Sequence, residues 1–188
     1  MGETQEGGFG RELAAGVSEE RHNRSWYDRS HEELVHAFQA WLPRRERTWA
    51  KDPAAEDRPY PLAAVIHKEL QLNLDRDYAD TEEPFFTPIL HAWDAIAYDL
   101  YEPGTGYERY AGHSLSRISR QNREPMIELT DPLQVKILDA LADVTGIRRE
   151  KGQKTVAIPE HLQNYEAWSK TPAYQQRLAQ ARTLPPQR

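Results

Sequence analysis

Apolar residues recur every three to four positions in several segments of the chain, which is the spacing of one face of an α-helix. The clearest stripe follows Asp131-Pro132, a pair typical of a helix start because the carboxylate caps free N–H groups and proline fits the first turn. Gly146 fits the left-handed position just past a helix end. The other long stripes begin at Ser30, Leu62 and Thr87. These four segments are predicted to be the main helices.

Prolines set the expected ends of several helices. Pro43 lacks a backbone N–H and clashes with the preceding turn, so it is expected to stop or kink the helix that starts at Ser30, and a new helix can restart from it. The helix that starts at Thr87 is expected to reach about Tyr101. Two shorter helices are predicted over residues 159–168 and 173–182.

One segment has the composition of strands. Residues 147–158, "IRREKGQKTVAI", are rich in β-branched residues in their second half, and Lys151-Gly152 is typical of a turn. The pattern therefore predicts a small β-hairpin near residues 147–158. Together with the stripes, it predicts an all-α fold, an irregular bundle of about six helices with this one hairpin.

The chain divides into a predicted domain and two predicted ends. Residues 1–17 contain five of the ten glycines and little apolar surface, so we expect a flexible N-terminal arm. Residues 18–182 are expected to form a single helical domain, which fits a length of 188 residues. Residues 183–188 are expected to be a frayed C-terminal tail.

Composition limits the cellular compartments in which this protein is expected. There are no cysteines, which excludes disulfide bonds and thiolate metal sites. The chain shows neither the pattern of a secretory signal nor a run of ~18 apolar residues, the length that spans a bilayer. A cytoplasmic protein without a membrane span is therefore the expectation.

Charge is unevenly distributed along the chain. The net charge is −6, which disfavours a general nucleic-acid binder. Residues 51–102 carry four Lys/Arg against twelve Asp/Glu, whereas residues 103–158 carry nine against seven. Such asymmetry fits a partner surface or self-association, and a plain solvated surface produces it too.

The stretch HEELVH, His31 to His36, has the residue types of a metal site. A zinc-protease helix needs H-E-x-x-H, whereas these two histidines are five residues apart and fall on different sides of a helix. Glu33 and His36 fit the Glu-x-x-His step of di-iron bundles, but the chain lacks the second copy that such a site needs. Ser30 and Glu33 also fit a capping box. We expect a capped helix start and no cofactor, with Glu33 and His36 as the weak candidates for a metal.

A buried acid is predicted on the second helix. Glu69 and Asn73 fall within the apolar face of the helix that begins at Leu62. A buried carboxylate must find a partner or raise its pKa. One interpretation is that Glu69 forms an internal ion pair with an arginine, which would compensate for its burial. The alternative is a polar pocket of Glu69, Asn73 and His31, which would make the protein an enzyme or a small-ligand binder.

The third helix carries a second row of polar residues. This row lies opposite the apolar stripe, so it is predicted to face solvent or a partner, and it consists of His91, Asp94, Tyr98 and Glu102.

Basic residues gather in the second half of the chain. They are Arg117, Arg120 and Arg123, spaced at i, i+3 and i+6, and Arg148 and Arg149 in the predicted hairpin. Arginine and tyrosine are enriched at protein interfaces. The leading hypothesis is a non-catalytic interaction or accessory subunit of a larger assembly, with a protein partner or a second copy. The alternatives are the enzyme or ligand binder above, and a DNA-binding regulator that uses the basic half.

Overall fold

The computed structural model describes residues 29–49, 62–72 and 86–183. Within these ranges the chain forms seven α-helices, two short 3₁₀ helices and one two-stranded sheet, so the predicted all-α fold is confirmed. The elements are α2 (His31–Trp49), α3 (Leu62–Leu72), α4 (Phe86–Ala97), η1 (Tyr98–Leu100), α5 (Gly106–Gln121), β1 (Met126–Glu128), α6 (Pro132–Thr145), β2 (Thr155–Ala157), η2 (Glu160–Leu162), α7 (Tyr165–Trp168) and α8 (Pro172–Thr183).

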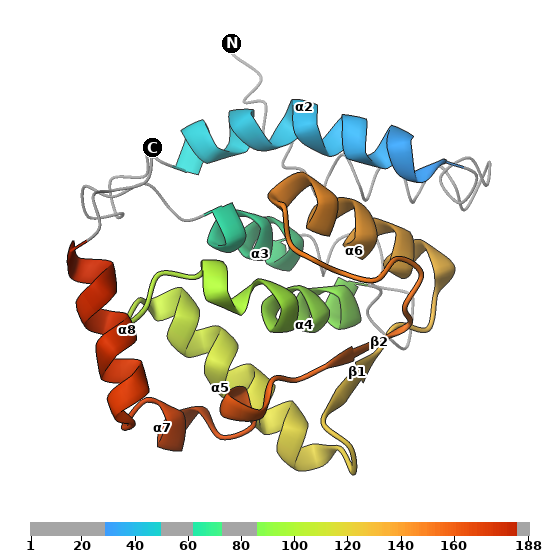
Figure 1. The fold of residues 1–188 in the computed structure, drawn as a ribbon. Coiled ribbons are helices and arrows are strands. Elements are labelled where there is room, and N and C mark those ends of the chain that lie inside the picture. The colour runs from blue at the N-terminus through green and yellow to red at the C-terminus, as the bar shows by residue number, and fades with distance from the viewer. Residues whose placement is uncertain (1–28, 50–61, 73–85, 184–188) are drawn as a thin grey trace.

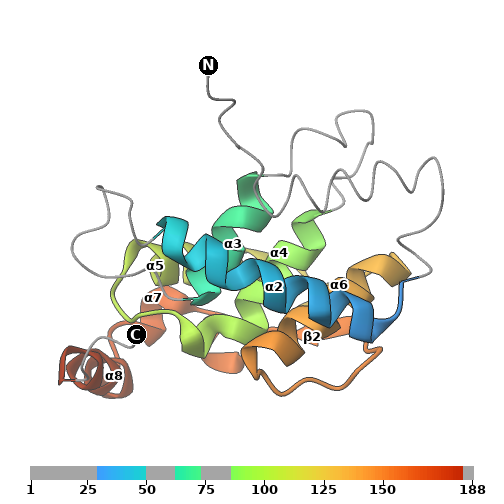
Figure 2. The same ribbon diagram turned by 90° about the horizontal axis from the view of Figure 1, so that it is seen from above.

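Helix α4 is the centre of the bundle. It packs against α3, α5 and α6, and α5 and α6 lie on opposite sides of it (Figure 1). Helix α2 lies across α3 and α6, as the view from above shows (Figure 2). The central side chain is Trp93, which is fully buried and donates a hydrogen bond from Nε1 to the Ala63 carbonyl, 3.1 Å away. This contact ties α4 to α3.

Helix α6 has the predicted start and end. The Asp131 carboxylate accepts from the Leu133 N–H at 2.8 Å, and the Gln134 side chain accepts from the Asp131 N–H at 3.1 Å. Gly146 adopts a φ of 75°, a left-handed conformation that glycine enters without a Cβ penalty. Local sequence therefore defined both ends of this helix.

Helix α5 was not among the predicted helices. Its buried residues include the small Ala111, Gly112, Ser114 and Ser116, and an apolar stripe of Tyr107, Ala111, Leu115 and Ile118 packs against the core. A Cβ at Gly112 would collide with the Tyr165 ring, which shows how closely α5 and α7 approach each other. The helix was missed although this stripe has helical spacing, because charged and hydroxyl residues fill most of the positions between its members.

The predicted hairpin was wrong in its first arm. β2 lies in the predicted second arm, and residues 151–152 do form a turn. However, β2 pairs with β1, with Ile127 opposite Val156, and residues 147–150 form no strand. Ile127 and Val156 are both buried. A strand from an earlier part of the chain therefore wins the pairing because it brings an apolar residue to the core.

Pro43 does not stop α2, which continues to Trp49. A proline removes one helical hydrogen bond and leaves those of the other turns in place. The predicted arm, residues 1–17, lies outside the described residues, and so does the predicted tail apart from Thr183, the last residue of α8. No helix in the described part of the chain is long and apolar enough to cross a membrane.

Candidate functional site

The HEELVH stretch starts α2 with a capping box. The Ser30 N–H donates to Glu33 Oε2 at 2.7 Å, and the Glu33 N–H donates to Ser30 Oγ at 3.2 Å. His36 is exposed. Among the described residues no three His, Asp or Glu side chains are grouped so that they could hold a metal ion. Glu33 therefore accepts from the Ser30 N–H, and the described residues do not group it with other metal ligands.

His31 joins two helices. Its Nε2 lies 2.5 Å from Asp143 Oδ2 at the end of α6, and Lys151 Nζ lies 3.2 Å from the same oxygen. Hydrogen bonds from His31 and then Lys151 lower the pKa of Asp143. His31 therefore contributes to the contact between α2 and α6.

Glu69 is buried on α3 as the pattern predicted, with 3% of its surface exposed. Asn73 lies outside the described residues.

A different polar cluster joins α3 to α4. His67 Nδ1 lies 2.6 Å from Asp94 Oδ1, and the Tyr101 hydroxyl donates to the same oxygen at 2.7 Å. All three side chains are buried. Asp94 Oδ2 is buried as well and has no hydrogen-bond partner among the described residues. We call His67, Asp94 and Tyr101 the Asp94 cluster.

The prediction that Asp94 and Tyr98 face solvent was wrong. Asp94 is 0% exposed and Tyr98 is 2% exposed. His67 of α3 and Tyr101 contact Asp94, whereas His161 and Arg177 pack against the Tyr98 ring. The periodicity of one helix does not show which other elements cover its polar side. Burial, followed by the nearby Asp94, raises the pKa of Tyr101 well above its usual value, so this tyrosine stays a hydrogen-bond donor.

Burial also lowers the pKa of His91, although Asp94 partly opposes this effect.

The Tyr110 ring lies edge-on to His67 with 5.3 Å between ring centroids, and Tyr110 is itself 48% exposed. The Asp94 cluster is therefore covered by a half-exposed side chain of α5.

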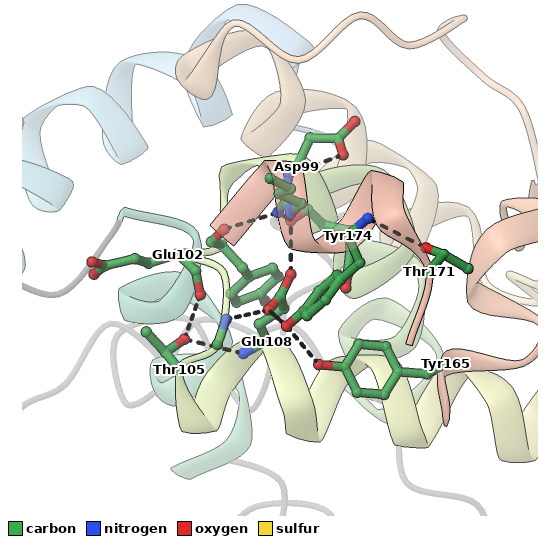
Figure 3. Close-up of polar contacts among 11 residues, drawn as sticks. Asp99, Glu102, Thr105, Glu108, Tyr165, Thr171 and Tyr174 are labelled. Carbon is green, nitrogen blue, oxygen red and sulfur yellow. Dashed lines mark hydrogen bonds and ion pairs between the residues drawn. The ribbon is translucent and has the colours of Figure 1, made fainter. Parts of the chain in front are cut away.

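A second buried acid, Glu108, holds the C-terminal helix (Figure 3). Its Oε2 accepts from the Gly104 N–H at 2.5 Å and from the Tyr174 hydroxyl at 2.7 Å, and its Oε1 accepts from Arg177 Nε at 3.2 Å. Because Tyr174 donates to Glu108, the Tyr165 hydroxyl donates to Tyr174 across 3.2 Å. Both oxygens of this fully buried carboxylate are satisfied, which is typical of a structural network.

Arg177 extends the network to the chain that leads into α5. Its Nη2 donates to the Tyr98 and Tyr101 carbonyls at 3.3 and 3.1 Å. Burial, and then the Tyr165 hydroxyl and Glu108, raises the pKa of Tyr174 far above its usual value. These contacts bind α8 to the body of the protein.

The exposed side of α5 is basic. The arginines and the histidine of α5 and Arg123 of the following loop are all exposed. We call this set the basic face: Arg109, His113, Arg117, Arg120 and Arg123. The single acid of α5, Glu108, is buried. No member of the basic face forms an ion pair with another described residue.

Sequence reasoning found three members of the basic face and missed Arg109 and His113, because it did not recognise the helix that they share. A signal was present. Thr105 precedes Glu108 by three residues, the spacing of a capping box, and the Thr105 hydroxyl does accept from the Glu108 N–H at 3.4 Å.

The other two arginines that were predicted to bind a partner lie elsewhere. Arg149 already has a partner within the protein. Its side chain is 5% exposed, and its Nε lies 2.7 Å from Asp139 Oδ1. The Gly152 N–H donates to the other oxygen of Asp139 at 2.8 Å, so this pair fastens the loop after α6. Arg148 is exposed and belongs to the same loop, which follows α6, and α6 lies on the other side of α4 from α5 (Figure 1). The structure therefore does not bring these two arginines to the basic face.

Comparison with known proteins adds no name to these sites. No family model, no curated protein and no solved structure matches the chain.

Proposed function

We propose that this chain is a non-catalytic accessory or adaptor subunit that binds a larger protein through the basic face of α5. The observation that carries the proposal is a set of five exposed basic side chains without ion-pair partners among the described residues, in a chain of net charge −6. Like charges three or four residues apart destabilise a helix slightly. An acidic partner would relieve that repulsion.

Charge alone gives little affinity, since an exposed ion pair contributes about 0–1 kcal/mol. Two exposed apolar side chains lie close to the basic face in the chain. Tyr110 is 48% exposed on α5, and Met126 is 37% exposed three residues after Arg123. Tyrosine, methionine and arginine are the residue types enriched in the centres of protein interfaces. These side chains supply the apolar contact that the arginines lack.

A cytoplasmic location is part of the proposal. It is supported by the absence of cysteine, because secreted domains commonly depend on disulfide bonds.

The test compares two variants with matched charge changes. R117E/R120E reverses two charges of the basic face, and K154E/R182E reverses two exposed charges elsewhere. The full-length wild type and both variants are tagged, expressed in the native cells and captured, and the bound proteins are quantified by mass spectrometry.

We expect one stoichiometric protein with the wild type and with K154E/R182E, and a loss of about tenfold or more with R117E/R120E. Equal recovery from all three, or no stoichiometric protein from any, would contradict the proposal. Circular dichroism of each purified variant shows whether the fold is retained.

A second proposal, from the Asp94 cluster, is a small-ligand site. An unpartnered buried carboxylate oxygen costs free energy, about 1–3 kcal/mol for an unsatisfied polar group, and a bound hydrogen-bond donor would recover it. Asp94 orients His67 through Nδ1, the arrangement that positions a general acid or base. This keeps the enzyme hypothesis open and transfers it from Glu69 to His67 and Asp94.

The ligand proposal is tested by thermal unfolding of the wild type and of Asp94→Asn against a library of amines and alcohols. A compound that raises the melting temperature of the wild type and not of the variant supports the site. If no compound separates the two proteins, the Asp94 cluster is structural.

A further inference from the structure

The basic side chains of α5 form a single row along the helix. Arg109, His113, Arg117 and Arg120 follow one another at steps of four, four and three residues. At about 100° per residue they fall within an arc of about 80°. At about 1.5 Å per residue the row is about 17 Å long. These basic residues therefore form a ridge along one side of the helix, about 80° wide, rather than a cluster around one point.

We infer that the protein that binds the basic face presents an acidic α-helix lying alongside α5. This inference rests on the proposed function and names the chemistry of the partner. Side-by-side helices place side chains of matching three- and four-residue spacing opposite each other. An arginine guanidinium forms paired hydrogen bonds with a carboxylate. A helix with Asp or Glu at steps of four, four and three residues would face each basic residue of the ridge in turn.

The half-exposed Tyr110 favours a protein helix over a phosphate backbone. On the same helical projection its side chain lies about 20° beyond Arg117, so it borders the ridge. A helix has room for an apolar residue beside its row of acids, and that residue would cover the Tyr110 ring. The net charge of −6 also opposes a long polyanion such as DNA, because the rest of the chain would repel it.

The test uses synthetic helices as probes. Two labelled alanine-based peptides of about five turns contain the same number of glutamates and are held helical by an internal cross-link. One has its glutamates at steps of four, four and three residues, and the other has them spread around the helix. Binding to the full-length wild type, R117E/R120E and K154E/R182E is followed by fluorescence anisotropy at low salt. A duplex DNA oligonucleotide and phosphatidylserine–phosphatidylcholine vesicles are the competing probes.

We expect the in-row peptide to bind the wild type about fivefold tighter than the spread peptide, because fewer glutamates of the latter can reach the ridge. R117E/R120E should abolish the difference, and K154E/R182E should keep it. Equal binding of the two peptides to the wild type would overturn the inference, as would tighter binding of DNA or vesicles than of the in-row peptide. The capture experiment decides the proposed function independently, because a partner that depends on the basic face but contacts it without a helix leaves that proposal standing.

Discussion

The two faces of α5 handle charge in opposite ways. On the buried face, Glu108 is 0% exposed and accepts hydrogen bonds at both oxygens from Gly104, Tyr174 and Arg177. On the exposed face, basic side chains stand in a row without ion-pair partners among the described residues. Removing a buried charge leaves its partners unsatisfied and so destabilises the fold. A charge without such a partner at the surface is free to bind something else, and the comparison therefore separates stability from binding on one helix.

The largest expected effect follows from removing the buried charge. Glu108→Gln should lower the free energy of unfolding by about 3 kcal/mol, since it leaves Arg177 without its buried counterion. Urea unfolding measures the loss. The control is Glu166→Gln, which removes an exposed acid paired with Lys170 at 3.2 Å and should change stability by less than about 0.5 kcal/mol. Similar losses of unfolding free energy in the two variants would show that the contribution of Glu108 to stability does not depend on its burial.

A second pair of variants separates two neighbouring arginines. Arg149→Met breaks the buried pair with Asp139 and should cost about 2–3 kcal/mol, whereas Arg148→Met removes an exposed charge and should cost less than about 0.5 kcal/mol. Thermal and urea unfolding give both values. If Arg148 proved the costlier of the two, the structural role assigned to Arg149 would be wrong.

These arginines also show how far the sequence could predict the structure. Helix α6 was predicted at both ends, because its cap, proline and final glycine act locally. The basic face was only partly predicted, because the stripe of Tyr107, Ala111, Leu115 and Ile118 is interrupted by small and polar residues and was not recognised as a helix. Adjacent Arg148 and Arg149 look alike in the sequence. Asp139 accepts hydrogen bonds from Arg149 and from the Gly152 N–H in the same loop, so Arg149 is the one that is buried. These contacts depend on the tertiary fold and not on the local sequence.

The Asp94 cluster was missed for a related reason. Its acid lies opposite the apolar stripe of α4, so periodicity alone placed it in solvent. The side chains that contact it are His67 of α3 and Tyr101, and no local pattern on α4 predicts these contacts. By contrast, burial of Glu69 was predictable because that residue interrupts an apolar stripe on its own helix.

The buried tyrosines predict an alkaline limit to stability. Burial is the main cause that raises the pKa of Tyr98, Tyr101 and Tyr174 above the ordinary value of 10.0. In the unfolded chain these hydroxyls lose their protons above about pH 10, whereas in the folded protein they keep them. Their contribution is therefore fully present below pH 10 and is lost as the pH rises, by up to about 1.4 kcal/mol per tyrosine for each pH unit.

Urea unfolding at a series of alkaline pH values measures this slope. Tyr174→Phe should reduce the slope by the share of one tyrosine. If stability stayed constant from pH 9 to 11 (about one unit either side of the ordinary tyrosine pKa), the burial of these hydroxyls would be contradicted.

The smallest expected effect is on the exposed face. Arg117→Ala and Arg120→Ala should each change the free energy of unfolding by less than about 0.5 kcal/mol, since each side chain is exposed and has no ion-pair partner among the described residues. A loss of about 2 kcal/mol in either variant would mean that the basic face is part of the fold.

The most direct test of the separation between stability and binding is one experiment on two variants. The captured partner and the free energy of unfolding are measured together for R117E/R120E and for Glu108→Gln, at a temperature where both variants remain folded. The account predicts that R117E/R120E keeps most of its stability and loses the partner, whereas Glu108→Gln loses stability and keeps the partner. If R117E/R120E retains the partner at the wild-type level, the basic face is not the binding surface and the central claim is wrong.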